Sequence, residues 1–175
     1  MRRIVPLINE RKFPSAVSEV TAFLSREMIP EVRSDALGMR ANLNEHTGDL
    51  EAAAQDLLTA CSLVVSSYGR YVHELSLAGI YRKREQMDDS LSWCRTALRT
   101  CLECEGISGG SALTDLLLLC GRGRLAPQDQ DLCERVARRS WAVLGLPGEP
   151  DVADLSATVS EIKRCEANPP RKSQS

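Results

Sequence analysis

A pattern of small and apolar residues returns at a spacing of 37 residues, and it limits the possible folds more than any other feature. Small residues stand at Ala16, Ala53 and Ser90. Around each, the positions at offsets −3, +4 and +7 are also apolar or small, and these offsets share one face of an α-helix. The flanking residues are Phe13, Leu50, Met87, Val20, Leu57, Cys94, Phe23, Ala60 and Ala97. Since one such unit cannot bury its apolar face alone, the pattern predicts helices stacked on their neighbours.

Two of the three units carry an earlier helix as well, predicted over residues 35–47 and 71–85. Ala41 and Ala78 occupy equivalent positions in these two helices. Residues 41–43 (Ala-Asn-Leu) followed by 47–53 (Thr-Gly-Asp-Leu-Glu-Ala-Ala) resemble a tetratricopeptide repeat. Three departures from that family are clear. The period is 37 residues rather than about 34, which implies longer second helices. In the next unit Glu85-Gln86 replaces the Gly-Asp turn, and Ser90 and Cys94 replace an alanine and a bulky apolar residue.

The resemblance covers residues 3–105 and implies an all-α fold of about seven helices. The expected architecture is a tetratricopeptide-like, right-handed stack of antiparallel helix pairs, closed by a C-terminal capping helix over residues 152–162. We expect a single domain over residues 1–167 and a disordered tail over 168–175. Beyond residue 105 the pattern weakens. The helix that holds Leu116–Leu119 is apolar nearly all round, so it is either buried on several sides or covered by a partner.

Composition favours a globular protein and speaks against several other classes. The chain is 43% hydrophobic and 26% charged, with a net charge of −2, which does not suit a dedicated nucleic-acid binder. No apolar run reaches the length of about 18 residues that a membrane span needs, and the first residues do not match a secretory leader. Seven cysteines, an odd number, indicate reduced thiols. These features predict a cytoplasmic protein.

Groups for catalysis or metal binding are few, so we expect no enzyme, no cofactor and no metal. Cys101 and Cys104 form a C-x-x-C pair, and a redox or metal-binding protein that uses this pair is the alternative hypothesis. No second C-x-x-C accompanies it, and it lies near a helix end rather than at a helix start. A pair of Cys61 with His73 stays open, although Cys61 belongs to an apolar stripe.

Arginine-rich segments raise the possibility of phosphate or nucleic-acid binding. Residues 121–124 (Gly-Arg-Gly-Arg) lack the Gly-Lys-Ser/Thr ending of a phosphate loop. Two basic clusters, residues 82–84 and 138–139, have few aromatic residues between them for base stacking. We expect ordinary loops and solvated helix faces at these segments, so binding of nucleic acid is unlikely.

The tetratricopeptide resemblance implies protein binding in a concave groove, lined by the first helix of each pair. Such a module serves as an adaptor, a chaperone or a neutralising, immunity-type partner. Asn42 stands where family members often hold a peptide backbone with an amide. Gly38 replaces the lysine of a carboxylate clamp, so a C-terminal carboxylate is not the expected ligand. We expect a protein or peptide partner with acidic and apolar residues, and the oligomeric state is open. The implied partner-binding residues are Met39, Asn42, Glu45, His46, Leu75, Gly79, Arg82 and Lys83.

Overall fold

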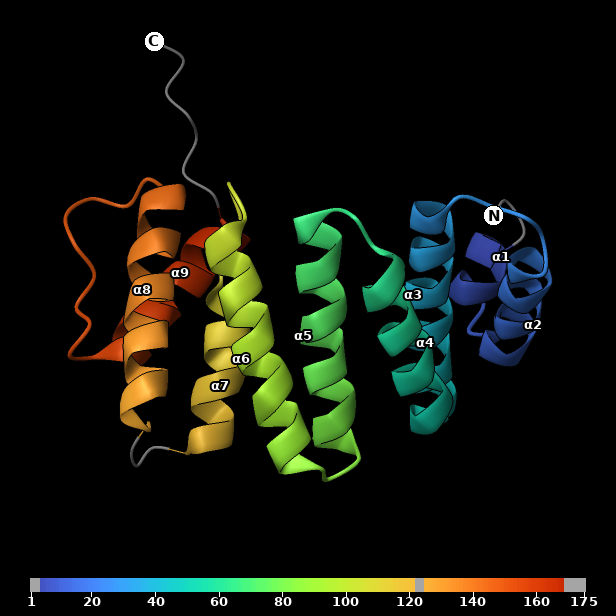
Figure 1. Ribbon diagram of the computed structural model, residues 1–175, viewed down its shortest axis with the longest axis horizontal. Coiled ribbons are helices and arrows are strands. Elements are labelled where there is room, and N and C mark those ends of the chain that lie inside the picture. The colour runs from blue at the N-terminus through green and yellow to red at the C-terminus, as the bar shows by residue number, and fades with distance from the viewer. Residues whose placement is uncertain (1–3, 122–124, 169–175) are drawn as a thin grey trace, which may run out of the picture. The chain divides into compact units, whose positions relative to one another are not determined.

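The structure is a computed structural model, which describes residues 4–121 and 125–168 (Figure 1). All regular secondary structure in these residues is helical, as predicted, and nine helices are present among them. The short helix α1 has no counterpart in the prediction. The helices are α1 (Ile4–Asn9), α2 (Phe13–Leu24), α3 (Pro30–Thr47), α4 (Leu50–Leu63), α5 (Ser67–Lys83), α6 (Met87–Glu103), α7 (Gly110–Cys120), α8 (Pro127–Val143) and α9 (Leu155–Ala167). None of the helices in the described residues is long and apolar enough to span a bilayer.

The chain divides into two compact units, residues 1–90 and residues 91–175. In the first unit each helix from α1 to α5 packs against the next one along the chain. In the second unit α7, α8 and α9 pack against one another. The single repeat domain over residues 1–167 stays a prediction. The disorder expected for residues 168–175 falls, apart from Asn168, outside the described residues.

The repeated small residues lie on the inward faces of their helices. Ala16, Ala53 and Ser90 are between 0% and 1% exposed. The hydroxyl of Ser90 donates a hydrogen bond of 2.8 Å to the carbonyl of Ala78, so this polar residue is buried with its proton satisfied. Among the flanking residues of the pattern, Met87 at offset −3 is an exception, because half of its surface is exposed. The burial therefore agrees with the helix face that the 37-residue spacing predicts.

The turn from α3 to α4 has the structure that its sequence predicts. Gly48 ends α3 with a φ of 85°, in the left-handed region where glycine has no steric penalty. Asp49 precedes α4 and its side chain accepts a hydrogen bond of 3.0 Å from the amide of Ala52. At the equivalent turn from α5 to α6, Glu85 has a φ of 61°. The second turn therefore has the same left-handed conformation, but with a residue whose Cβ carries the steric penalty that glycine avoids.

A buried ion pair joins α3 to α4 in the first unit. The guanidinium of Arg40 donates to both carboxylate oxygens of Asp56, over 2.8 Å from Nε and 2.6 Å from Nη2. Asn44 donates a further hydrogen bond of 3.3 Å to the same carboxylate. Asp56 is buried, so these three bonds replace the water that its charge loses on folding.

The second unit contains a matching ion pair and a close helix contact. Arg95 on α6 donates to both oxygens of Asp129 on α8, over 2.7 and 2.8 Å. Gly109, directly before α7, lies so close to α8 that a Cβ there would be 2.3 Å from Cγ1 of Val136. Its amide donates to the hydroxyl of Ser140 over 3.0 Å. Glycine is required at residue 109 by this close approach rather than by a turn.

Candidate functional site

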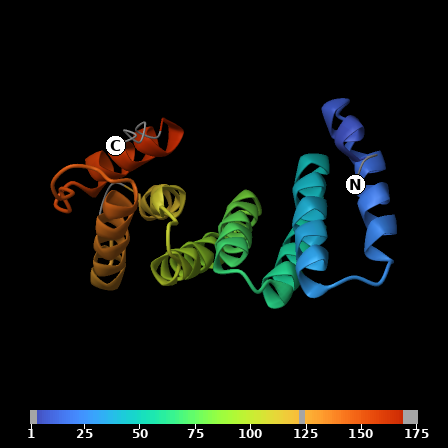
Figure 2. The ribbon, with the colours of Figure 1, turned by 90° about the horizontal axis from the view of Figure 1, so that it is seen from above.

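Helices α3 and α5 are neighbours in the first unit (Figure 2), and two side-chain contacts join them. Near their N-terminal halves, the hydroxyl of Ser34 is 3.1 Å from Nε2 of His73. Near their C-terminal ends, the ammonium of Lys83 pairs with the carboxylate of Glu45. Because both contacts follow the same order along the two helices, the helices are parallel. The residues of α3 and α5 that lie along these two contacts are called the α3–α5 surface below.

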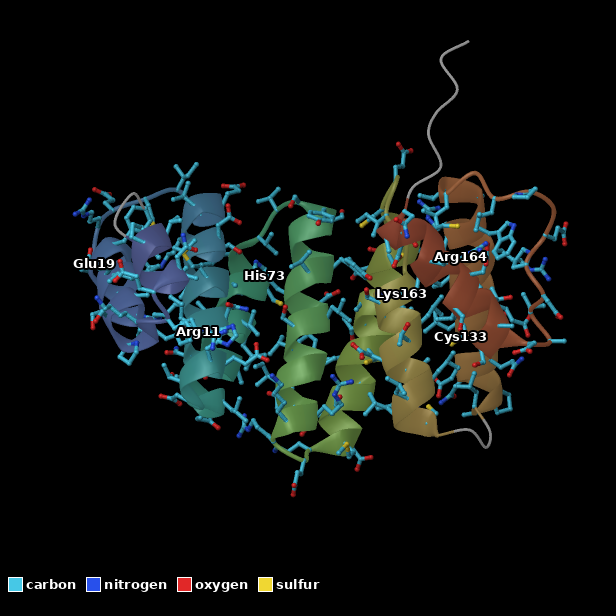
Figure 3. The ribbon with its side chains drawn as sticks, turned by 180° about the vertical axis from the view of Figure 1, so that it is seen from behind. Arg11, Glu19, His73, Cys133, Lys163 and Arg164 are labelled. Atoms are coloured by element: carbon cyan, nitrogen blue, oxygen red, sulfur yellow. The ribbon has the colours of Figure 1, made fainter. Side chains whose placement is uncertain are left out.

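His73 fills the space between these two helices (Figure 3). It is buried, and a Cβ at Gly38 would lie 2.7 Å from its Cε1 atom, so the missing side chain at Gly38 makes room for the ring. Ser34 donates its one proton to the carbonyl of Ala60 over 3.0 Å. Its oxygen must then accept from His73, which places the imidazole proton on Nε2. Of the two neutral tautomers of this ring, the hydrogen bond thus selects the one with its proton on Nε2.

Stability should depend on pH through this histidine. Burial lowers the pKa of His73, and the negative charge of Asp35 only partly opposes that effect. The unfolded chain therefore binds the proton more tightly than the folded chain. The stabilisation is complete above a pH of about 6.5 and is lost as the pH falls below it. Urea titrations between pH 7 and 5 should show a falling free energy of unfolding, and His73→Gln should flatten this dependence.

His46 provides the control for this measurement, since it is the other histidine of the two in the chain. It is exposed and stacks on the ring of Phe13, with centroids 4.8 Å apart. His46→Gln should leave the pH dependence close to that of the wild type. An equal loss of slope in both variants would show that burial of His73 is not its cause.

Three of the predicted partner-binding residues form the open part of the α3–α5 surface. Asn42 is exposed on α3, and no atom lies within 4 Å of the position that a Cβ would take at Gly79 on α5. Leu75 is half-buried one turn before Gly79. The α3–α5 surface thus combines the exposed amide of Asn42, the uncovered backbone at Gly79 and the apolar side chain of Leu75.

The other predicted residues have partners within the chain. Met39 packs against a buried cluster drawn from α1 to α4, and His46 stacks on Phe13. Glu45 and Lys83 form the ion pair that joins the two helices. Arg82 is half-buried near the end of α5. The sequence could not show these pairings, because each one joins residues from different helices.

Two exposed residues of α3 and α5 were not among the predicted residues. Asp35 is exposed on α3, and Val72 keeps 37% of its surface exposed on α5. Each lies three residues before a position already discussed, Gly38 and Leu75 respectively. Helical spacing alone would have identified them as members of the same face.

The C-x-x-C pair lies in the interior of the second unit. Cys101 and Cys104 are buried, and the thiol of Cys101 donates a hydrogen bond of 3.6 Å to the carbonyl of Ile107. Burial raises the pKa of Cys101 to about 11, with Cys104 adding to the effect. Because the thiolate is the reactive form, this environment suppresses nucleophilic and redox chemistry. Across residues 4–121 and 125–168, no three His, Cys, Asp or Glu side chains gather as a metal site.

The basic clusters are engaged in contacts with their own chain. Lys83 pairs with Glu45, and Arg84 pairs with Glu51 while its guanidinium lies 5.5 Å from the ring centre of Tyr81. In the second unit, Arg138 pairs with Glu149 over 3.1 Å, and Arg139 donates to the carbonyl of Cys104. Residues 122–124 of the segment 121–124, where we expect an ordinary loop, lie outside the described residues. These pairings leave less positive charge for a nucleic acid than the sequence suggests.

A groove of about 890 Å³ lies between α7, the start of α8 and α9. The apolar helix that the sequence singled out, α7, supplies one of its walls. Leu116 is fully buried, whereas Leu118 is 66% exposed at the edge of the groove. Part of this helix therefore belongs to the core and part is open to a partner. The lining residues are Thr114, Leu117, Leu118, Gly121, Leu125, Gln130, Ala153, Leu155, Ser156, Val159, Ser160 and Lys163.

Comparison with known proteins identifies a similar fold and no family. The chain resembles the crystal structure of BtubC (BKLC) from P. vanneervenii, with a TM-score of 0.55 and 16% sequence identity. The match covers 98% of this chain and 82% of BtubC. No protein-family model and no curated protein matches the sequence. At this level of identity the likeness concerns the fold alone.

Proposed function

We propose that the protein is a tetratricopeptide-like interaction module, which binds a peptide or protein segment along the surface of α3 and α5. In this proposal its helix pairs form a right-handed stack, and it acts in the cytoplasm as an adaptor, chaperone or neutralising partner. The 37-residue pattern and the packing of each helix from α1 to α5 on the next support the stack. Seven cysteines without a disulfide are compatible with a reducing compartment.

One observation carries the proposal, which is the parallel pairing of α3 and α5 with an exposed amide on α3 and uncovered backbone on α5. Asn42 can donate to and accept from a peptide backbone at the same time. Gly79 leaves room for that backbone to approach, since nothing occupies the space above it. Leu75 adds apolar contact area, and Arg82 adds a guanidinium in the last turn of α5. This set suits a partner with apolar and acidic residues.

The proposal is tested with a partner recovered from the native source by affinity capture and identified by mass spectrometry. Asn42→Ala and Arg82→Glu should each weaken its binding about tenfold in calorimetry, as loss of a central contact does. Gln55→Ala is the matched control, because it removes an exposed amide from α4. That variant should bind like the wild type, and all three should keep the thermal midpoint.

Unchanged affinity in both Asn42→Ala and Arg82→Glu would exclude the α3–α5 surface as the binding site. The alternative function, redox or metal chemistry at Cys101 and Cys104, has less support because both thiols are buried. Rapid reaction of these thiols with a disulfide reagent in the folded protein would favour that alternative.

A further inference from the structure

Four exposed side chains stand in the N-terminal halves of α3 and α5. Glu31 and Asp35 are exposed on α3, four residues apart, so they share one helix face. Tyr68 and Val72 stand on α5 at the same spacing, and 65% and 37% of their surfaces are exposed. Each residue on α5 follows its counterpart on α3 by the 37 residues of the repeat pattern. Carboxylates thus stand on one helix where an aromatic and an aliphatic side chain stand on the other.

The contact between Ser34 and His73 places these side chains on one side of the helix pair. Asp35 follows Ser34 by one residue, and Val72 precedes His73 by one residue. An α-helix turns by about 100° per residue. Because α3 and α5 are parallel, one step forward on α3 and one step back on α5 rotate the side chains toward the same side of the pair. Asp35 and Val72 therefore flank the Ser34–His73 contact on its exposed side.

The carboxylates at this end of the α3–α5 surface differ from the one at the other end. Near the C-terminal ends of the helices, Glu45 is already paired with Lys83. Within residues 4–121 and 125–168, neither Glu31 nor Asp35 forms an ion pair or a side-chain hydrogen bond. Glu31 lies in the first turn of α3, where a negative charge also suits the helix dipole. Asp35 lies one turn further along, where that effect has faded, so the dipole does not account for its charge.

We propose that this end of the α3–α5 surface binds a lysine or arginine side chain of the partner segment, an inference that rests on the proposed function. The apolar stem of that side chain packs on Tyr68 and Val72, while its charged head pairs with Asp35. The ring of Tyr68 adds an attraction for the cation. Two helical turns further along, Asn42 and Gly79 receive the backbone of the same segment. The partner segment therefore carries a basic residue in addition to the apolar and acidic residues already proposed.

The experiment selects a displayed library of random short peptides on the full chain and measures the affinity of the enriched peptides by fluorescence anisotropy. Enriched sequences should share a lysine or arginine next to an apolar residue. Asp35→Lys should weaken their binding about tenfold, because an attraction is lost and a repulsion is added. Asp35→Asn removes the charge and keeps the shape of the side chain, so it should weaken binding about threefold. Tyr68→Ala should also weaken it about threefold, through lost apolar contact.

Asp88→Lys is the matched control, since it makes the same change at an exposed acidic residue in the first turn of α6. It should leave the affinity unchanged, and Asp35→Asn serves in place of Asp35→Lys if the latter lowers the thermal midpoint. Peptides that lose affinity with Asn42→Ala but bind both Asp35 variants and Tyr68→Ala like the wild type would overturn this inference and leave the α3–α5 surface in place. Peptides that respond to none of these variants would overturn both proposals. The inference also fails if no peptide is enriched, or if the enriched peptides lack a basic residue.

Discussion

Leu57→Ala should lower the free energy of unfolding by about 2–5 kcal/mol. Leu57 lies on α4, which packs against both α3 and α5, and only 3% of its surface is exposed. The substitution removes buried apolar area from the interior and leaves a cavity where α4 packs against its neighbouring helices. Chemical denaturation followed by helical circular dichroism measures the change.

Leu118→Ala is the control for this measurement, because it makes the same substitution at a leucine that is 66% exposed. Its free energy of unfolding should stay within about 0.5 kcal/mol of the wild-type value. A loss for Leu57→Ala as small as that expected for Leu118→Ala would mean that Leu57 is not the inward residue of its repeat unit.

Asp129→Ala should destabilise the second unit by about 3 kcal/mol, near the lower end of the range for breaking a buried ion pair. Asp129 is 2% exposed and receives both hydrogen bonds of the Arg95 guanidinium. Without the carboxylate that guanidinium loses its partner. The loss stays moderate because the Arg95 side chain keeps 26% of its surface exposed and can recover some water. Asp131→Ala is the control, since Asp131 forms an exposed pair with Arg135 on the same helix and should contribute less than about 1 kcal/mol.

The effect of Asp129 should also disappear in acid. The hydrogen bonds from Arg95 hold the pKa of Asp129 below its usual range, so the unfolded chain takes up the proton first. The stabilisation is present above a pH of about 4 and is lost as the pH falls below it. The difference in unfolding free energy between the wild type and Asp129→Ala should therefore shrink from pH 5 to pH 3. A difference that stays constant over this range would contradict a role for the charged form.

Part of the proposed binding surface could be predicted from the sequence, through the resemblance to a tetratricopeptide repeat. Asn42, Leu75 and Gly79 were predicted, and the structure leaves Asn42 exposed with open space above Gly79. The prediction failed to anticipate that Lys83 pairs with Glu45 across two helices, or that His46 stacks on Phe13. Each of these contacts joins residues more than 30 positions apart, whereas a helical pattern relates residues within one or two turns.

The helices and their inward faces could be predicted from the amino-acid sequence, because helix formation and amphipathic spacing depend on residues near one another in the chain. Ala53, Leu57 and Ala60 are buried where the pattern placed them. Which polar and apolar side chains remain exposed became clear from the packing of the helices. That outcome depends on distances between helices, as when His73 occupies the space left by Gly38 and Leu118 remains exposed beside α9. Such distances are set by the packing of whole helices, which no local pattern encodes.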